Sequence, residues 1–561
     1  MSQSNLRNRA LELLGKDPAA AWELRLRQDP LSAWISADNA IEDLSPAFSG
    51  NEIKELGWSQ APIEDWMIFL HPDQRECVEY QASGPLLVKG AAGTGKSVVG
   101  YHRALHLEKR QREAGNPLRV LVTTFNKPFS LTQQELMKRL SQRSISQSET
   151  NSLIDIRTID SLAYQICSNA GINATVGNWE TAFKRAYRAS PLSDRYTQQY
   201  LQDEVLLLIK GRGLTEFEEY AEIDRLGRKV PFRRETRRQV WALYEAYEQA
   251  KKPDENDSDE GYQRDWQDNV LEALRIARHD PPYYSSCIVD EIQDFTLAKL
   301  QLVAAVVSEP EEDIPPDGLT LLGDEAQRLY PGGCTLSNAG IVIHRHLSKK
   351  LSRNYRNSQE ILDAAWAVAG DDLVESLDSD GSVERQAVKS IGAPRIGRKP
   401  RLVACPTEQS QDDTLLKIVE ELCENDIQIG DIAVLCISAD QSKHFGRVLR
   451  DSGIAVLPLY NYKGQQKAAI KVGTHRNSRS LEFKAVILPD ISENVLPRSR
   501  EMTGHGEKEH EEDLLAAKSH LYVAMTRARE RLDLLYVGEP SEFLWDYLDF
   551  FDRGRRSLRG K

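Results

Sequence analysis

The sequence predicts an α/β protein with parallel sheets, built as two α/β units with a helical subdomain inserted into the first and a helical N-terminal extension. From Pro85 onward, short apolar runs alternate with helical stretches, and the runs end in Gly, Asp or Thr. Buried parallel strands show this pattern, and their functional loops lie at their C-terminal ends. The 561 residues also exceed what one core accommodates, so about three or four compact units are expected.

The first α/β unit is predicted over 66–165 and 281–345. Its strand-like runs are LLV (86–88), VLVTT (120–124), CIVD (287–290) and LTLLGD (319–324). Residues 166–280 are helical and charged, which favours an inserted helical subdomain. The second α/β unit is predicted over 346–541 and includes a polar linker near 370–400. Its strand-like runs are RLVAC (401–405), IAVLCI (432–437), AIKVGT (469–474), AVILPD (485–490) and LDLLYVG (532–538).

The two ends of the chain are expected to differ from the α/β units. Residues 1–65 are helix-prone and rich in tryptophan. A packed helical cap and a docking surface for a partner protein are both open interpretations of this extension. Residues 542–561 end in DRGRRSLRGK and are expected to form a basic tail.

The composition excludes several classes of protein. No run approaches the ~20 apolar residues of a membrane span, and the first residues lack the apolar segment of a signal peptide. The seven cysteines are scattered and never spaced as C-x-x-C, which argues against a disulfide scaffold, a zinc ribbon or an iron–sulfur cluster. A cytoplasmic protein is therefore expected. The net charge of −13 does not exclude nucleic acid, because a phosphate backbone responds to a local channel.

A glycine-rich loop predicts nucleotide binding. GAAGTGKS (90–97) fits the pattern G-x-x-x-x-G-K-[ST], follows the strand-like LLVK and opens a helical stretch. Backbone N–H groups of such a loop approach phosphate oxygens, the Lys96 amine reaches the β- and γ-phosphates, and the Ser97 hydroxyl ligates Mg²⁺. The expected phosphate-binding residues are Gly90, Ala91, Ala92, Gly93, Thr94, Gly95, Lys96 and Ser97. ATP and Mg²⁺ are the ligands that this loop predicts.

An acidic pair predicts hydrolysis of the bound nucleotide. VDEIQD (289–294) closes the strand-like run CIVD. Asp290 at the strand end is the expected second contact to Mg²⁺, and Glu291 is placed to polarise the attacking water. An exposed acidic loop would have the same sequence. The acidic pair therefore indicates hydrolysis only in combination with the upstream glycine-rich loop.

Three further segments carry polar side chains suited to a γ-phosphate. They are LLGDEAQRLY (321–330), NYRNSQEI (354–361) and VAMTRARERL (523–532). Gln327 is placed to sense the γ-phosphate, and arginines delivered from a second domain can neutralise charge on the transferring phosphoryl group. Each segment alone is equally compatible with a strand-end turn or surface arginines, so their order carries the argument.

That order resembles the successive motifs of the superfamily 1 DNA helicases of the UvrD/Rep type. The matching segments are HPDQREC, GAAGTGKS, VTTFNKP, TIDSLAY, DEIQD, GDEAQRLY, NYRNS, a T-x₆-LEF stretch and YVAMTRARERL. They cover roughly residues 70–165 and 280–541. The resemblance implies two RecA-like motor domains with ATP held between them. It also implies movement along single-stranded DNA with 3′→5′ polarity.

The resemblance further implies roles for particular residues. Gln74 would read the adenine, Tyr355 would stack on it, and Glu482 would hold the ribose. Arg356 and Arg527 would be two arginine fingers that act with the catalytic residues Glu291 and Gln327. The residues expected to contact DNA are Thr124, Phe125, Asn126, Thr158, Ser161, Tyr330, Thr474, His475 and Arg476.

Three departures from the family pattern leave efficient duplex unwinding open. Gly332 stands near the place of an aromatic residue that stacks on a DNA base, and stacking is worth about 1–3 kcal/mol per base. Aromatic residues that could compensate are Phe125, Tyr164 and Tyr330. Ser480 precedes LEF where the family has glycine, which would cost strain at a positive φ. Residues 451–474 join two strand-like runs without the family's large helical insertion.

Two functions therefore remain. The first is an ATP-dependent DNA helicase or translocase. The alternative is an ATP-gated DNA-sensing or regulatory subunit of a repair or phage-defence complex, which hydrolyses ATP but unwinds poorly. The expected partners are single-stranded or partly duplex DNA and, through residues 1–65, a nuclease or another protein. A P-loop kinase or small-molecule ligase would not account for the arginines of NYRNSQEI and VAMTRARERL.

Overall fold

The computed structural model describes most of the chain from Leu70 to Arg553. The described residues are 70, 72–91, 93–115, 118–124, 153–225, 228, 230–252, 262–280, 283–309, 312–323, 335–354, 356–370, 397–462, 468–478, 481–493, 495–497 and 507–553. The extension predicted over 1–65 lies outside this set. Within it, no helix combines the length and the apolar character that crossing a membrane requires.

The first domain is built on a six-stranded sheet in which every neighbouring pair is parallel. Its order is β3-β2-β4-β5-β1-β6. The strands are β1 (Leu86–Gly90), β2 (Arg119–Thr124), β3 (Ile154–Thr158), β4 (Tyr284–Val289), β5 (Leu319–Gly323) and β6 (Ser348–Leu351). The four predicted apolar runs are the central strands, whereas β3 and β6 form the two edges and were not predicted. The first domain therefore extends beyond the predicted limit at residue 345, because β6 pairs with β1.

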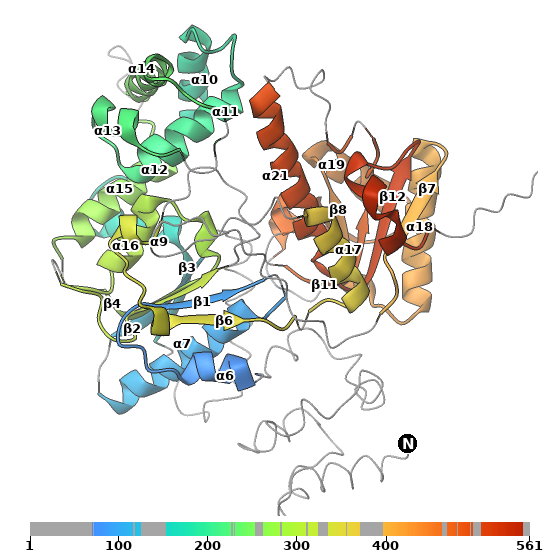
Figure 1. The fold of residues 1–561 in the computed structure, drawn as a ribbon, viewed down its shortest axis with the longest axis horizontal. Helices are drawn as coiled ribbons and strands as arrows, with labels where there is room; N and C mark the ends of the chain where they lie inside the picture. The colour runs from blue at the N-terminus through green and yellow to red at the C-terminus, as the bar shows by residue number, and fades with distance from the viewer. Residues whose placement is uncertain are drawn as a thin grey trace, which may run out of the picture.

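Helices cover both faces of this sheet (Figure 1). They are α6 (Pro72–Glu79), α7 (Lys96–Glu113), α9 (Ile159–Asn169), α15 (Trp266–Ala277) and α16 (Leu297–Ala305), with short 3-10 turns η3 (Ile292–Asp294), η5 (Ser337–Ala339) and η6 (Arg345–Leu347). The fully buried Arg103 of α7 donates to the carbonyl oxygens of Cys77 and Val78 and pairs with Asp317 at 2.8 Å. This arginine ties α6 and α7 to the strand that begins two residues after Asp317.

The inserted subdomain has a core of its own. Its elements are α10 (Trp179–Ala189), α11 (Gln198–Asp203), the π-helical η2 (Glu204–Ile209), α12 (Lys210–Arg212), α13 (Phe217–Glu222) and α14 (Arg234–Ala250). Buried aromatic and aliphatic side chains between Ala182 and Tyr247 form this core. In contrast, α9 and α15 pack into the core of the first domain. The separate unit is therefore narrower than the predicted 166–280.

The second domain is built on another fully parallel six-stranded sheet, ordered β7-β12-β11-β8-β10-β9. The strands are β7 (Arg401–Cys405), β8 (Ile432–Cys436), β9 (Val456–Pro458), β10 (Ile470–Thr474), β11 (Phe483–Leu488) and β12 (Ala528–Val537). The helical elements are α17 (Gln359–Ala369), α18 (Glu408–Glu424), α19 (Ala439–Asp451) and α21 (Glu507–Met525), with 3-10 turns η8 (Ile429–Asp431), η9 (Leu459–Asn461), η10 (Arg476–Ser478) and η11 (Glu542–Phe550). One core holds α17 and α21 and a second holds α18 and α19. Two parallel sheets with covering helices confirm the predicted α/β class.

The prediction of a tail over 542–561 was wrong for its first part. Leu544 and Phe551 are buried in the core of the second domain. Asp552 pairs with Arg401 as an isolated bridge beside the edge strand β7. Because apolar residues of η11 cover the sheet, the second domain extends to about residue 552.

The insertion contacts both domains. α12 packs against α16 of the first domain. On the other side, Glu512 of α21 accepts a hydrogen bond from the Val230 amide at 2.9 Å and one from the Tyr200 hydroxyl at 3.4 Å. Figure 1 shows α21 rising from the second domain toward this subdomain.

Candidate active site

The phosphate loop lies between the end of β1 and the start of α7. Gly93 and Gly95 have positive φ angles of 81° and 83°, which glycine adopts without strain. A Cβ at Gly93 would lie 2.5 Å from the Asn354 amide nitrogen, so a larger residue at this position would also clash with Asn354. The Lys96 ammonium donates to the carbonyl oxygens of Gly90 at 2.6 Å and Ala91 at 3.0 Å. The lysine is therefore held over the concave side of the loop.

Gln74 connects α6 to this loop. Its side-chain amide donates to the Thr94 carbonyl oxygen at 3.0 Å, and the side chain is buried. Thr94 in turn donates its hydroxyl to the Ala91 carbonyl oxygen at 2.9 Å. Gln74 thus lies beside the phosphate loop, and the predicted contact of its side chain with adenine stays a prediction.

The two acidic residues lie at the C-terminal end of β4, beside the phosphate loop. Asp290 and Glu291 are both buried, and Glu291 has a positive φ of 56°. Burial and the neighbouring Glu291 raise the pKa of Asp290, against the opposing effects of the Ser97 hydroxyl, which bonds to it, and of Lys96. The fold thus brings the two predicted metal ligands, Ser97 and Asp290, into contact.

These groups fit a divalent cation. Burial raises the pKa of Asp290, and repulsion from the adjacent Glu291 carboxylate raises it further. A bound cation would relieve this repulsion, and a hydroxyl with a carboxylate is a donor set that Mg²⁺ accepts. The Gln293 side chain donates to Glu291 Oε2 at 2.5 Å and so orients the carboxylate predicted to polarise water.

The second domain supplies the two predicted arginine fingers. Arg356 forms an ion pair with Glu482, the residue that precedes β11. Burial would raise the pKa of Glu482, but Arg356, Arg529 and Arg527 lower it, so the carboxylate is surrounded by guanidinium groups. Arg527 is almost fully buried and donates to the carbonyl oxygens of Val523 at 2.9 Å and Leu481 at 3.3 Å.

The charges of the two domains meet at Arg527. Burial lowers the pKa of Arg527 to about 9, and Arg356 adds to this effect. Glu291 of the first domain and Glu482 of the second act in the opposite direction. Electrostatic coupling between Arg527 and Glu291 places the arginine motif of one domain opposite the acidic motif of the other.

Two asparagines that the sequence analysis did not single out hold this arrangement together. Asn354 accepts the amide of Arg356 at 2.9 Å and donates to Asn357 Oδ1 at 3.0 Å. Asn357 donates to the carbonyl oxygens of Thr526 at 3.0 Å and Ala528 at 2.6 Å. The pair therefore links the phosphate loop, Arg356 and the residues on either side of Arg527. Their position on either side of Tyr355 and Arg356 in NYRNS was the available signal.

Three of the described residues expected to contact DNA lie at strand ends: Thr124 and Thr158 in the first domain, and Thr474 in the second. Thr124 and Thr158 are register partners at the ends of β2 and β3. Thr158 uses its hydroxyl to cap α9 by accepting the Ser161 amide at 3.2 Å. Thr474 ends β10, and its hydroxyl accepts the Asn477 amide at 3.2 Å.

His475 and Arg476 differ although they are adjacent. The His475 ring is buried, and burial lowers its pKa to about 4, so the ring is neutral near pH 7. A buried neutral ring does not fit the predicted phosphate contact. Arg476 is exposed on η10 and keeps that role as a prediction.

Several predicted residues lie outside the described part of the chain. They are Ala92, Phe125, Asn126, Gln327, Tyr330 and Tyr355, together with the departures Gly332 and Ser480. The third departure, residues 451–474, is described except for 463–467. The helical and strand elements described between β8 and β10 are α19, β9 and η9.

A carboxylate cluster elsewhere is an internal ion network rather than a metal site. Oxygens of Glu248, Asp265 and Asp268 lie within 4.8 Å of one another. The buried ammonium of Lys210 lies 2.6 Å from Asp265, and that of Lys251 lies 2.7 Å from Asp268. These two ammonium groups occupy the place that a cation would take, and they join α12 and α14 to α15.

Comparison with known proteins identifies both domains. The UvrD/REP helicase N-terminal domain matches residues 70–331, and the UvrD-like helicase C-terminal domain matches residues 460–539. The first match contains the phosphate loop and the acidic pair. The second contains Glu482 and Arg527.

Individual relatives are distant. The chain is 24% identical over 391 residues to YjcD of Bacillus subtilis, covering 65% of the chain and 46% of the relative. It is 23% identical over 428 residues to the ATP-dependent DNA helicase UvrD1 of Mycobacterium tuberculosis, covering 70% of the chain and 50% of the relative. The chain thus spans about half the length of these curated relatives.

One solved structure is weakly similar. It is the C-terminal domain of a possible DNA helicase from Lactobacillus plantarum, at 17% identity and a TM-score of 0.24, covering 34% of this chain and 92% of that one. A likeness of this strength carries no argument about fold or function. The two domain matches, together with the parallel sheets and the site between them, do carry one. The chain belongs to the UvrD/Rep-type superfamily 1 helicase family and has both of its RecA-like domains.

Proposed function

We propose that this protein is an ATP-hydrolysing motor that moves along single-stranded DNA, with 3′→5′ polarity, and remodels DNA as it moves. One observation carries the proposal: Arg527 of the second domain lies within electrostatic reach of Glu291 of the first. A nucleotide site divided between two domains changes when the domains move, which is what a motor requires. The membership of the family supports DNA as the track.

The first domain would bind and activate ATP. Lys96 would leave the carbonyl oxygens of Gly90 and Ala91 and donate to the β- and γ-phosphates. Ser97 and Asp290 would hold Mg²⁺, and a bound Mg²⁺ supplies charge neutralisation on the phosphate oxygens. Glu291, oriented by Gln293, would accept a proton from the attacking water.

The second domain would complete the site. Arg356 and Arg527 would donate to the phosphoryl group as negative charge moves toward the leaving oxygen. Arg527 is held by carbonyl oxygens and is therefore already in place, whereas Arg356 must exchange part of its pairing with Glu482. Binding of ATP would draw the domains together, and hydrolysis would weaken that attraction. DNA contacts near Thr124, Thr158, Thr474 and Arg476 would convert this cycle into movement.

The direct test is a steady-state ATPase assay of the full chain with and without a single-stranded oligonucleotide. We expect hydrolysis that requires Mg²⁺, increases with the oligonucleotide and is lost in Lys96→Ala. A well-folded wild-type protein whose ATPase ignores DNA would contradict the proposal. Movement from the 3′ end would be measured as faster displacement of streptavidin from a 5′-biotinylated than from a 3′-biotinylated strand.

The short connection between β8 and β10 favours a second candidate. This connection consists of residues 437–469, and its described helical and strand elements are α19, β9 and η9. We therefore keep an ATP-gated DNA-sensing or regulatory subunit, from a repair or phage-defence complex, as the alternative. A DNA-stimulated ATPase that displaces no strand from a partly duplex substrate would favour it. A nuclease or other partner bound through residues 1–65, and a cytoplasmic location, stay predictions.

A further inference from the structure

A basic pocket lies on the second domain, at the edge of the sheet formed by β7. It is an open cavity of about 710 Å³, and the start of β7, β12 and the residues after η11 contribute to its lining. Its cationic lining residues are Arg398, Lys399, Arg401, Arg531 and Arg553, against the two carboxylates of Glu421 and Asp552. The whole chain has a net charge of −13, so this concave surface differs in charge from the rest of the protein and would attract anions.

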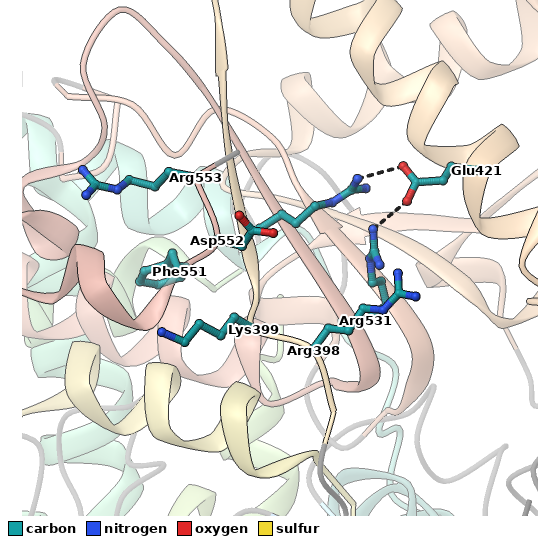
Figure 2. Close-up of a pocket in the computed structure, with 8 residues that line it drawn as sticks. Arg398, Lys399, Glu421, Arg531, Phe551, Asp552 and Arg553 are labelled. Atoms are coloured by element: carbon teal, nitrogen blue, oxygen red, sulfur yellow. Dashed lines mark hydrogen bonds and ion pairs between the residues drawn. The ribbon is translucent and has the colours of Figure 1, made fainter. Parts of the chain in front are cut away.

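The floor of the pocket is made of paired charges. The guanidinium groups of Arg401 and Arg531 each lie 2.7 Å from Glu421. Dashed lines in Figure 2 mark the contacts of Glu421. Both also pair with the fully buried Asp533 of β12. These four charges compensate one another, so the floor carries no net positive charge.

The rim of the pocket holds the uncompensated charge. Arg398, Lys399 and Arg553 are all exposed, and Asp552 is the carboxylate beside them among the described lining residues. The Lys399 ammonium donates to a main-chain oxygen, that of Asp549, at 2.8 Å. Figure 2 shows these side chains distributed around the cavity rather than gathered at one point.

The distribution fits a linear polyanion better than a single small anion. After Arg553 the sequence continues with Arg555, Arg556, Arg559 and Lys561. These four cations add positive charge to the sequence that follows the rim. Guanidinium groups favour phosphate because they can donate two hydrogen bonds to it at once.

The pocket is connected to the candidate active site. Gly397, which precedes the rim, donates its amide to Glu360 at 2.7 Å, at the start of the helix that follows Arg356. Arg531 lies four residues beyond Arg527, which along a strand is on the order of 13 Å. A ligand in the pocket would therefore contact the same strand that follows the arginine finger.

We propose that this pocket binds the phosphate backbone of the DNA strand outside the motor track, as an anchor independent of base sequence. The inference rests on the proposed function, because it takes DNA as the ligand. Contacts to phosphate alone would give binding that depends strongly on salt and little on sequence.

The test uses the full chain and a fluorescein-labelled 20-nucleotide oligothymidine. The rim variant is Arg398→Gln, Lys399→Gln and Arg553→Gln combined. Its matched control is Lys443→Gln, Arg447→Gln and Arg450→Gln, which removes three exposed cations from α19 of the same domain. This control is remote because α19 packs on β8, β9 and β10, away from the β7 edge. Circular dichroism melting checks that both variants fold.

We expect the slope of log affinity against log salt to fall by about 2 in the rim variant, since each lost single-strand phosphate contact removes about 0.7. The control should keep the wild-type slope. Wild-type binding with an unchanged slope in the rim variant would overturn the inference and leave the proposed function intact. A wild-type protein that neither binds the oligonucleotide nor increases its ATPase with it would overturn both.

Competition separates the sources of phosphate. Tripolyphosphate and polyglutamate are titrated against the labelled oligonucleotide with each protein. Weak competition by both at matched charge supports a DNA backbone contact. Tight tripolyphosphate binding that the rim variant loses, with no change in its oligonucleotide slope, would identify a small-anion site and contradict the inference. Tight polyglutamate binding with the same pattern would identify an acidic protein segment instead.

Discussion

The two halves of the nucleotide site are held in different ways. In the first domain, Lys96 bonds to main-chain carbonyl oxygens of its own loop, and Asp290 bonds to the Ser97 hydroxyl. In the second domain, Arg356 is held by a carboxylate, that of Glu482. The first half thus lies within one domain, where the phosphate loop meets the end of β4. The second half is assembled from three separate segments: Asn357 joins its own segment to that of Arg527, and Arg356 joins it to that of Glu482.

This difference assigns different tasks to the two halves. A half that lies within one domain can bind nucleotide whatever the position of the second domain. A half that is assembled from separate segments responds when those segments move. We expect substitutions in the first half to abolish binding or chemistry outright, and substitutions in the second to separate ATP binding from hydrolysis.

Lys96→Ala should have the largest effect. Loss of the ammonium removes a donor aimed at the charge that develops on the phosphates, which costs at least ~100-fold in hydrolysis rate. The measurement is the steady-state ATPase rate at saturating Mg²⁺. Lys109→Ala, an exposed lysine on the same helix, is the matched control and should keep the wild-type rate. Equal loss in both variants would mean that α7 had been damaged rather than the site.

Arg356→Ala and Arg527→Ala should each reduce hydrolysis by about 10³-fold while nucleotide binding persists, because arginine fingers act on the transition state. Their stabilities should differ. Arg527 is buried and satisfies carbonyl oxygens, so its loss should cost about 1–3 kcal/mol in the free energy of unfolding, whereas Arg356 has access to solvent. Thermal melting and nucleotide titration measure the two quantities. Equal melting temperatures for the two variants would mean that buried Arg527 stabilises the fold no more than Arg356 does.

Glu482→Gln should distinguish two roles for this carboxylate. If Glu482 mainly holds Arg356, the neutral side chain releases the arginine and lowers kcat, by about tenfold for the loss of ~1.4 kcal/mol of positioning. If it mainly holds the ribose, KM for ATP rises with little change in kcat. The structure favours the first outcome, since three arginines lower the pKa of Glu482 and keep it ionised. A change in KM alone would favour the ribose role.

Glu512→Gln should have the smallest effect. It weakens the contact between α21 and the insertion, where Glu512 accepts the Val230 amide and lies 3.5 Å from Arg228. An ion pair of this kind contributes about 1 kcal/mol or less. Hydrogen exchange of the peptide that contains Val230 should accelerate, and the exposed neighbour Glu511→Gln should leave it unchanged. Identical exchange in both variants would mean that the contact does not hold the insertion in solution.

The sequence predicted the centres of both sheets better than their edges. Central strands such as β4 and β8 are buried on both faces and read as continuous apolar runs. Three edge strands, β3, β6 and β9, were missed because each buries only part of its residues and carries polar or proline positions. An apolar pattern is a weaker signal for such a strand, although RLVAC did predict the fourth edge strand, β7.

The active-site predictions show the same limit. The phosphate loop and the acidic pair are local patterns, and the fold brings Ser97 and Asp290 together as predicted. The motif NYRNS contains Asn354 and Asn357, but it does not show that Asn357 donates to the main-chain oxygens of Thr526 and Ala528, which are far away in the sequence. The sequence around His475 suits a phosphate contact, but it does not show that the His475 ring is buried.

The central claim is that hydrolysis needs both halves of the site and is driven by DNA. The most direct measurement is the single-turnover rate of ATP hydrolysis in the wild type and in Arg527→Ala, each with and without single-stranded DNA. We predict that DNA accelerates the wild type and that Arg527→Ala binds ATP with near-normal affinity but shows no DNA-dependent acceleration. Full DNA-stimulated hydrolysis by Arg527→Ala would contradict the claim that the second domain completes the site.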